Sequence, residues 1–171
     1  MRQPCRVSRL SPEVAAYIAG LIDGEGTITL TRLHSGANRR LVVSIANTEF
    51  QILKFVMEQV CAGKITSKRT TSDHHTPSFC YAISSDQALA LLEQVAPCLR
   101  SYKRQRADLA LDSYRAVTPR NGRYSTGQLI KRQEFERSFL DLKAVKAGAS
   151  PGRHAQRVLL TNPIPSDRER S

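Results

Sequence analysis

The spacing of apolar residues along the first hundred positions predicts helices that alternate with paired strands. Apolar residues every third or fourth position indicate helices, and apolar residues at every second position indicate strands. The pattern predicts helices over 12–23, 48–60 and 86–95, and strands over 27–33, 39–46, 64–71 and 78–84. Each pair of strands is consecutive in the chain, which favours antiparallel hairpins with helices packed on one face.

Further helices are predicted beyond this repeat. A basic helix over 101–116 and a last helix over 128–146 follow the third core helix. The sequence therefore predicts an α+β fold, a mixed αββαββα core around an antiparallel sheet with additional C-terminal helices. We expect one domain over residues 1–147. Residues 148–171 are rich in proline, arginine and serine, and we expect this basic tail to be flexible.

One face of the predicted sheet is too polar to belong to a core. Its outward positions carry hydroxyl groups and positive charge, and with the neighbouring Arg39 the candidate DNA contacts are Thr27, Thr29, Thr31, Arg39, Arg40, Ser44, Thr66, Lys68 and Thr70. Such a face can lie in the major groove of DNA, where Arg, Lys, Ser and Thr bind phosphates and base edges. The alternative is an ordinary solvated face, because threonine is a good strand former.

Charge favours a nucleic-acid partner. The chain has 171 residues with 26 Lys and Arg against 15 Asp and Glu, a net charge of +11 and a pI near 10.0. Residues 27–84, which contain the predicted hairpins, hold seven Lys or Arg against three acids. A sheet face that only contacts solvent would need no such excess of positive charge. Double-stranded DNA is therefore the expected partner, ahead of an acidic membrane surface.

Other classes of protein find little support in the sequence. No apolar run has the length of a membrane span, and residues 1–6 lack the apolar core of a signal peptide. We therefore expect an intracellular protein that does not bind membranes. Its four cysteines form no Cys-x-x-Cys pair and are interpreted as reduced, mostly buried thiols. Its histidines lack partners at metal-ligand spacing, so no structural zinc site is predicted.

The stretch from Ile18 to Gly26 is unusual for a helix end. Ser11 and Pro12 begin the helix as N-cap and first helical residue. Ala16, Gly20 and Gly24 then lie four apart on one stripe, although each helical glycine costs about 1 kcal/mol relative to alanine. Glu25 ends the helix, where the helix dipole disfavours a carboxylate by up to about 1 kcal/mol. Close approach of a second helix and a bound cation would explain these two features.

The sequence of this stretch, Ile-Ala-Gly-Leu-Ile-Asp-Gly-Glu-Gly, resembles the signature of the LAGLIDADG homing endonucleases. The resemblance implies a curved, saddle-shaped sheet that binds DNA and cuts it with Mg²⁺ or another divalent cation such as Mn²⁺. It implies that Glu25 binds the metal with help from the main-chain carbonyl of Gly24. Asp23 is assigned a structural role, hydrogen bonding to backbone near the motif helix.

The resemblance to single-motif members also implies residues that organise water around the metals. Asn47, with Gln51 one helical turn further on, matches a polar residue after the second strand, where glutamine is the expected residue. Lys103 matches the lysine that begins the helix after the second hairpin. A slip of alignment there would transfer the role to Arg104 or Arg100.

The chain contains one copy of the signature, whereas cutting both DNA strands requires two active sites. A homodimer packed through Ala16, Tyr17, Gly20 and Gly24 would supply the second Glu25 and would bind a near-palindromic target. The leading hypothesis is an intron-encoded homing endonuclease. The alternatives are an RNA maturase, for which RNA would be the partner, a DNA-binding protein that does not cut, or an inactive descendant. The carboxylate of Glu25 favours the nuclease, because a protein that only binds needs no acid there.

Overall fold

The computed structural model describes residues 6–67, 76–119 and 124–144. The elements follow the predicted order. They are α1 (Pro12–Glu25), β1 (Gly26–Thr31), β2 (Arg40–Asn47), α2 (Phe50–Val60), β3 (Lys64–Ser67), β4 (Phe79–Ser84), α3 (Ser85–Val95), the 3₁₀ helix η1 (Ala96–Cys98), α4 (Lys103–Ser113) and α5 (Thr126–Asp141).

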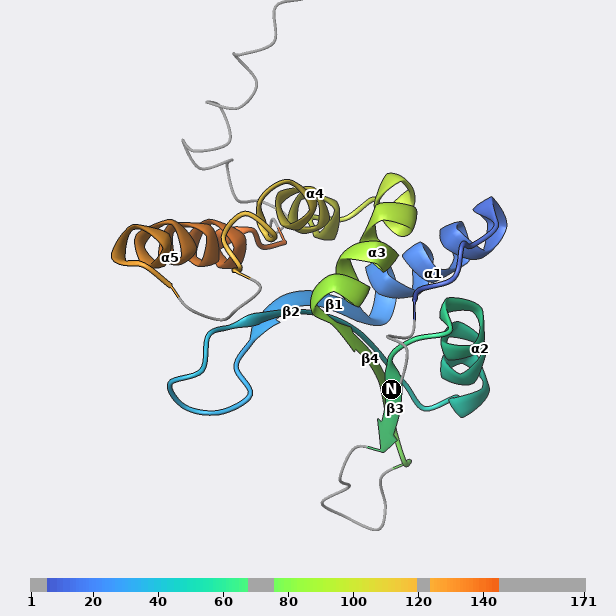
Figure 1. Ribbon diagram of the computed structural model, residues 1–171. Coiled ribbons are helices and arrows are strands. Elements are labelled where there is room, and N and C mark those ends of the chain that lie inside the picture. Colours follow the sequence, from blue (N-terminus) through green and yellow to red (C-terminus); the bar gives the residue numbers. More distant parts are fainter. Residues whose placement is uncertain (1–5, 68–75, 120–123, 145–171) are drawn as a thin grey trace, which may run out of the picture.

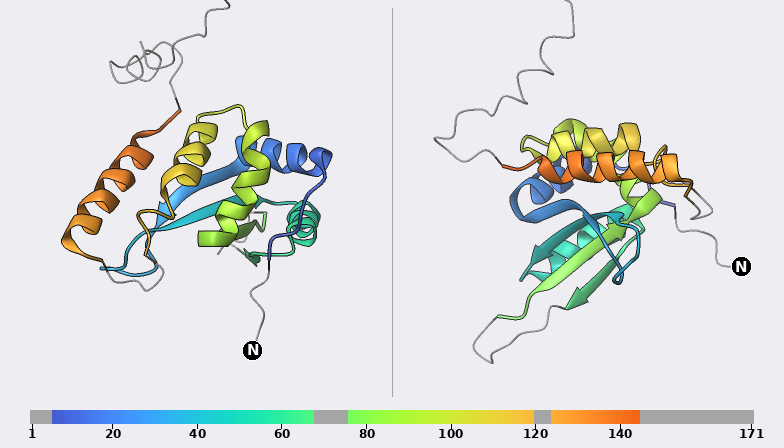
Figure 2. Two further views of the ribbon diagram at one scale, coloured as in Figure 1. Left: turned by 45° about the horizontal axis from the view of Figure 1, so that its top comes forward. Right: turned by 90° about the vertical axis from the view of Figure 1, so that its left-hand side faces the viewer.

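The strands form one antiparallel sheet in the order β1-β2-β4-β3. The sheet is strongly curved, and the helices lie on its convex side while the concave side stays uncovered (Figure 1). Two further views show α4 and α5 side by side above the β1 end of the sheet (Figure 2). The predicted α+β architecture with an open, saddle-like antiparallel sheet is therefore confirmed.

Strand alternation explains why only one face of the sheet is covered. Leu41, Val43 and Ile45 in β2 are fully buried, while Arg40, Val42 and Ser44 between them are not. Ile28 and Leu30 of β1 and Tyr81 and Ile83 of β4 continue the buried face. The core forms where these side chains meet the apolar faces of the helices, at residues that include Ile18, Ile22, Leu53, Val56, Leu89, Leu92 and Ala107.

The starts of α1 and α5 follow local capping chemistry. The hydroxyl group of Ser11 accepts a hydrogen bond from the amide of Val14 at the start of α1. Ser125 and Gln128 form a capping box that begins α5 two residues before its predicted start. Ser84 occupies the N-cap position of α3 without a side-chain capping bond, and Ser85 has a left-handed φ of 54°.

Several predicted boundaries are corrected by the structure. Helix α1 runs two residues beyond Asp23, to Glu25. Helix α2 starts at Phe50 rather than at residue 48, because the side chain of Asn47 binds the amide of Glu49 and holds a turn there. Helix α4 is shorter than predicted at both ends, and α5 ends at Asp141. Strand β1 ends at Thr31, short of residue 33.

The thiols are less buried than expected. Among the described cysteines, Cys61 is exposed, and Cys80 and Cys98 are half-buried. No helix among the described residues has both the length and the apolar character that crossing a membrane demands. Residues 68–71 of the predicted third strand, the domain boundary after residue 147 and the predicted tail lie outside the described residues.

Candidate active site and nucleic-acid interface

Glu25 lies where α1 passes directly into β1. It is the last residue of the helix, and Gly26 is both its C-cap and the first residue of the strand. A side chain at position 26 would place a Cβ 2.6 Å from the Cα of Ile22 and 3.0 Å from the main-chain oxygen of Ser44. Only glycine permits this close approach of the helix end to β2. The junction therefore holds the exposed Glu25 carboxylate at the end of the sheet.

Asn47 holds one oxygen of that carboxylate. It ends β2, and its Nδ2 donates to Glu25 Oε2 at 2.9 Å. Its Oδ1 accepts from the amide of Glu49 at 2.8 Å, which fixes the orientation of the side-chain amide. The structure thus brings together Glu25 and Asn47. Gln51 lies exposed in the first turn of α2.

Lys103 and Asp23 join the end of α1 to the start of α4, because the side chain of each binds the main chain of the other segment. Lys103 Nζ donates to the main-chain oxygens of Ile22, at 2.7 Å, and of Asp23, at 2.9 Å. The Asp23 carboxylate accepts from the amides of Arg100, at 2.7 Å, and of Ser101, at 3.3 Å, and from the Ser101 hydroxyl at 2.6 Å. We call these contacts the α1–α4 clasp. Lys103 thus gives a donor to the carbonyl of Asp23 and a second one to that of Ile22, which also accepts from the amide of Gly26.

The surroundings of the clasp residues shift the pKa values of Lys103 and Asp23. Burial lowers the pKa of Lys103, against the opposing effect of the Asp23 charge, and the charge of Arg106 lowers it further. Burial tends to raise the pKa of Asp23. The hydrogen bonds from Ser101 and from the amides of Arg100 and Ser101, with the charge of Lys103, outweigh burial and hold that pKa below its usual value. Asp23 thus remains ionised and matches the structural role predicted for it.

The uncovered face of the sheet presents its side chains in rows that cross the strands. Strand pairing aligns Thr27 with Ser44, Ser44 with Ala82, and Ala82 with Lys64. A second row aligns Thr29, Val42 and Ser84, and a third aligns Thr31 with Arg40. Thr66 lies opposite Cys80 on the same face. The predicted contacts Thr27, Thr29, Thr31, Arg40, Ser44 and Thr66 therefore share one concave surface.

Lys64 also belongs to this face, although it is not among the contacts predicted from the sequence. It stands next to the inward-facing Ile65, so the same alternation that selected Thr66 could have found it. Arg39 is positioned differently: its guanidinium group donates to the main-chain oxygen of Leu30 at 3.2 Å and pairs with Glu136 of α5 at 3.4 Å. Lys68 and Thr70 lie outside the described residues.

The small-residue stripe of α1 is exposed. Ala16, Gly20 and Gly24 are accessible, and a Cβ added at either glycine would meet no atom of the described residues within 4 Å. The glycines are therefore not needed for packing within this part of the chain. Tyr17 beside the stripe is 47% exposed and makes an edge-on contact with Phe55 of α2, with ring centroids 5.6 Å apart.

The residues at the helix end fit a magnesium ion with few protein ligands. Magnesium prefers oxygen ligands, retains several waters and is commonly bound by one or two carboxylates together with substrate phosphates. Glu25 is exposed, and only Oε2 of its carboxylate accepts from Asn47. Asp23, by contrast, is fully engaged in the clasp. Among the described residues, no group of three or more His, Cys, Asp or Glu side chains could hold a metal by itself.

The fold and the site together define a class of protein: an α+β protein whose curved sheet is open on its concave side, with a carboxylate at a helix end beside it. No family model matches the sequence. No curated protein matches it either. Solved structures do match, and they identify the fold.

The homing endonuclease I-CvuI in complex with its target has a similar structure, with a TM-score of 0.63 over 86% of this chain and 93% of that chain at 17% identity. The archaeal intron-encoded homing endonuclease I-Vdi141I complexed with DNA has a TM-score of 0.53 over 83% of this chain and 90% of that chain, at 13% identity. The LAGLIDADG meganuclease I-AabMI bound to uncleaved DNA has a TM-score of 0.52 over 91% of this chain and 51% of that chain, at 18% identity. The protein has the fold of LAGLIDADG homing endonucleases.

Proposed function

We propose that this protein is a site-specific homing endonuclease, encoded within an intron, that cuts both strands of a long, near-palindromic DNA target as a homodimer. The observation that carries this proposal is the placement of Glu25. A carboxylate at a helix C-terminus opposes the helix dipole, yet this one is positioned by a glycine junction and by Asn47. An exposed acid held in this way suits a cation that the DNA phosphates help to bind.

The roles of the chain's own residues follow from their positions. Glu25 and the main-chain oxygen of Gly24 would hold a divalent ion, Mg²⁺ or Mn²⁺, together with a DNA phosphate. When bound, such an ion supplies an activated water and neutralises charge on the phosphate and on the leaving oxygen. Asn47 orients the Glu25 carboxylate, and Lys103 fixes the end of the helix that carries it. Gln51 is proposed to order water beside them.

Binding of DNA is assigned to the concave sheet face. Its hydroxyl groups and the cations of Arg40 and Lys64 can hydrogen-bond to base edges and phosphates. The structures of similar fold include complexes with DNA, which supports this assignment. The exposed stripe of Ala16, Gly20 and Gly24, with Tyr17 beside it, is the proposed contact between two copies. Packing there would bring two Glu25 carboxylates to one two-fold axis.

Cleavage of a plasmid that carries the uninterrupted insertion site tests the nuclease proposal. With Mg²⁺ or Mn²⁺ we expect a double-strand break, and with EDTA none. Glu25→Gln should abolish cutting while retaining DNA binding. Glu58→Gln is the matched control, because Glu58 is an exposed glutamate of α2 paired with Lys54. Unchanged cutting by Glu25→Gln would refute the proposal, and binding without cutting by the wild-type protein would favour a DNA-binding protein or a maturase.

Mixed dimers test the assembly separately. If each copy cuts one strand, a dimer of one wild-type and one Glu25→Gln chain should nick the target rather than break it. Sedimentation of the free and DNA-bound wild-type protein should give the mass of two chains. A single chain bound to DNA that still breaks both strands would contradict the homodimer.

A further inference from the structure

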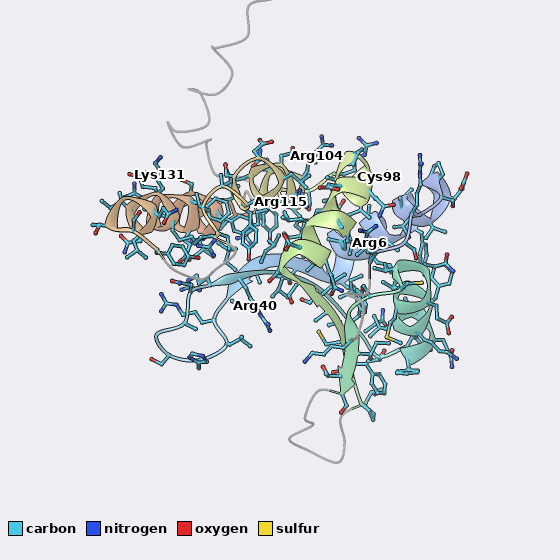
Figure 3. The ribbon with its side chains drawn as sticks, viewed as in Figure 1. Arg6, Arg40, Cys98, Arg104, Arg115 and Lys131 are labelled. Atoms are coloured by element: carbon cyan, nitrogen blue, oxygen red, sulfur yellow. The ribbon has the colours of Figure 1, made fainter. Side chains whose placement is uncertain are left out.

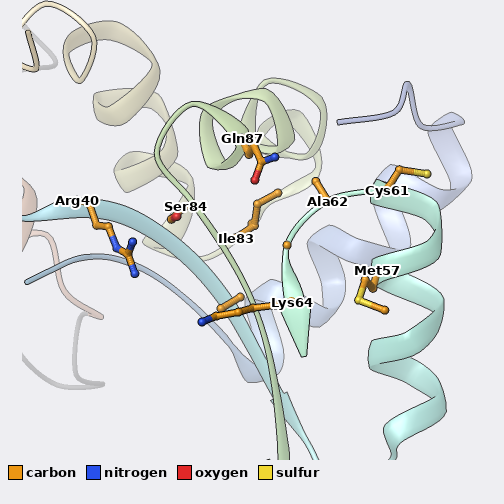
Figure 4. A pocket seen from close by; sticks show the side chains of 10 residues that line it. Arg40, Met57, Cys61, Ala62, Lys64, Ile83, Ser84 and Gln87 are labelled. Atoms are coloured by element: carbon orange, nitrogen blue, oxygen red, sulfur yellow. The ribbon is translucent and has the colours of Figure 1, made fainter. Parts of the chain in front are cut away.

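An open hollow of about 500 Å³ lies beside the start of β3. It is bounded by the uncovered face and by the ends of α2 and α3, and Arg40, Lys64, Ala82, Ser84 and Gln87 are among its lining residues. Figure 4 shows the side chains of Arg40, from β2, and of Lys64, from β3, directed into the same space. Arg40 lies on the concave side of the sheet (Figure 3).

The charge of this hollow is unbalanced. Arg40 and Lys64 both line it, while no Asp or Glu is among the described residues that do. No ion pair among the described residues involves either cation, whereas the neighbouring Arg39 is paired with Glu136. Two cations that converge without an acid repel each other, and an anion between them removes that repulsion.

The side chain of Arg40 gives an independent indication of an absent ligand. Its Nε is buried and has no hydrogen-bond partner among the described residues. Buried polar groups are nearly always paired, because an unpaired one loses its hydration without compensation. The guanidinium group would therefore be stabilised by moving to a position where its Nε–H meets a hydrogen-bond acceptor. An anion bound in the hollow would supply that acceptor.

We propose that Arg40 and Lys64 together bind one phosphate group of the DNA backbone. This inference rests on the proposed DNA-binding function. A concave site suits a group that protrudes, as a phosphate does, better than a base edge recessed in a groove. Lys64 also belongs to β3, one of the two edge strands of the sheet, which would lie nearest one rim of the groove. Ser84 adds a hydroxyl group to the same site.

The site is separate from the proposed cutting site. Strand β2 begins at Arg40 and ends at Asn47, which binds Glu25. Seven steps along a strand cover about 23 Å. Lys64 shares the row of Thr27 but lies three strands away from β1, which is about 14 Å across the sheet. The phosphate bound here is therefore not the one that is cut, and its role is to hold the protein in position on the duplex.

Salt dependence of DNA affinity provides the test, because each phosphate contact contributes about 0.9 to the slope of log affinity against log salt. For the full-length protein and duplex DNA of random sequence, the magnitude of this slope should fall by about 1.8 when both copies of a homodimer lose the contact. Arg40→Gln, Lys64→Gln and the double variant should all show this loss to a similar extent, since both cations share one phosphate. Lys64→Arg should retain the wild-type slope.

Lys54→Gln is the control for loss of one positive charge, because Lys54 lies on α2 in an exposed pair with Glu58. It should leave the slope unchanged. Circular dichroism should show that each variant is folded, and the Nε–H resonance of Arg40 should shift in the wild-type protein when duplex DNA is added. Titration with inorganic phosphate serves as the comparison, and a millimolar excess should not reproduce the shift.

Four results would overturn the inference. Unchanged slopes in all three variants would show that no phosphate is bound there, and additive losses would show two separate phosphates. A change of base preference without a change of slope would assign the residues to base reading. Tight binding of inorganic phosphate would make free phosphate the ligand. If the wild-type protein bound no DNA at all, the proposed function itself would fail, which is a distinguishable outcome.

Discussion

The ammonium group of Lys103 lies 2.7 Å from the main-chain oxygen of Ile22, three residues before the candidate catalytic Glu25. With the second bond to the oxygen of Asp23 it fixes the last turn of α1 from a helix that begins almost eighty residues later in the chain. The geometry of the candidate active site therefore depends on the α1–α4 clasp as much as on the signature stretch itself.

Replacing Lys103 with methionine tests this dependence. Lys103→Met removes the side-chain donor from the main-chain oxygens of Ile22, which keeps its bond from the amide of Gly26, and of Asp23. This loss should destabilise the protein by roughly 1–3 kcal/mol. Displacement of the helix end by about 1 Å should lower cleavage by about 10²-fold. Chemical unfolding and cleavage below the unfolding midpoint measure the two effects. Unchanged stability would show that the clasp contributes nothing to the fold.

Asp23→Asn should destabilise the protein in a pH-dependent manner. The pKa of Asp23 is lowered in the folded state, so its contribution is complete above its ordinary value of 3.8 and is lost as pH falls through the lower folded value. We expect a loss of about 1–3 kcal/mol at pH 7, because a charged acceptor is removed from two amides and a hydroxyl group. The difference between wild type and variant should shrink as the pH falls below about 4. A difference that is independent of pH would contradict this account.

Two glycines of the signature stretch should respond in opposite ways. Gly26→Ala forces a Cβ against the backbone of Ile22 and Ser44, and should destabilise the fold by about 1–3 kcal/mol or more. Gly20→Leu meets open space within the described part of the chain and should leave the fold intact while preventing the proposed dimer. Thermal unfolding and sedimentation separate the two effects. A dimeric Gly20→Leu variant would place the contact elsewhere.

Asn47→Ala should affect cleavage more than binding. It removes the hydrogen bond that orients the Glu25 carboxylate, and loss of such a supporting partner of a metal ligand typically costs roughly 10- to 100-fold in activity. Affinity for the target in Ca²⁺ should change little, because Asn47 lies at the end of the sheet face rather than within its rows. Equal losses in binding and in cutting would instead assign Asn47 to DNA contact.

Arg132 should be the residue on which the docking of α5 depends most. Its side chain is 2% exposed, lies against the rings of Tyr114 and Phe135, and donates to Glu136, to the Thr118 hydroxyl and to the main-chain oxygen of Arg39. Arg132→Met should destabilise the protein by about 3–5 kcal/mol. Arg137→Met, at an exposed position of the same helix, is the control. Equal stability of the two variants would contradict this role.

The sequence by itself determined the order of the elements and the faces of the strands. These follow from local rules: alternating apolar residues such as Leu41, Val43 and Ile45 bury one face wherever the strand lies. The N-cap at Ser11 and the role of Asp23 likewise depend on short-range chemistry or on the family pattern. Glu25 was identifiable because a carboxylate at a helix C-terminus is unusual without a ligand.

Only the tertiary structure decided which partners these residues meet. Nothing near position 23 in sequence indicates that Asp23 binds the amides of Arg100 and Ser101. The direction of Arg39 toward Glu136, and of Arg40 and Lys64 into one hollow, depends on strand order and on the position of α5. Contacts between residues distant in sequence form only when the chain folds, and the local spacing of apolar residues does not predict them. The glycine at 26 shows both aspects: its place in the signature is a property of the sequence, and its necessity is a property of the packing.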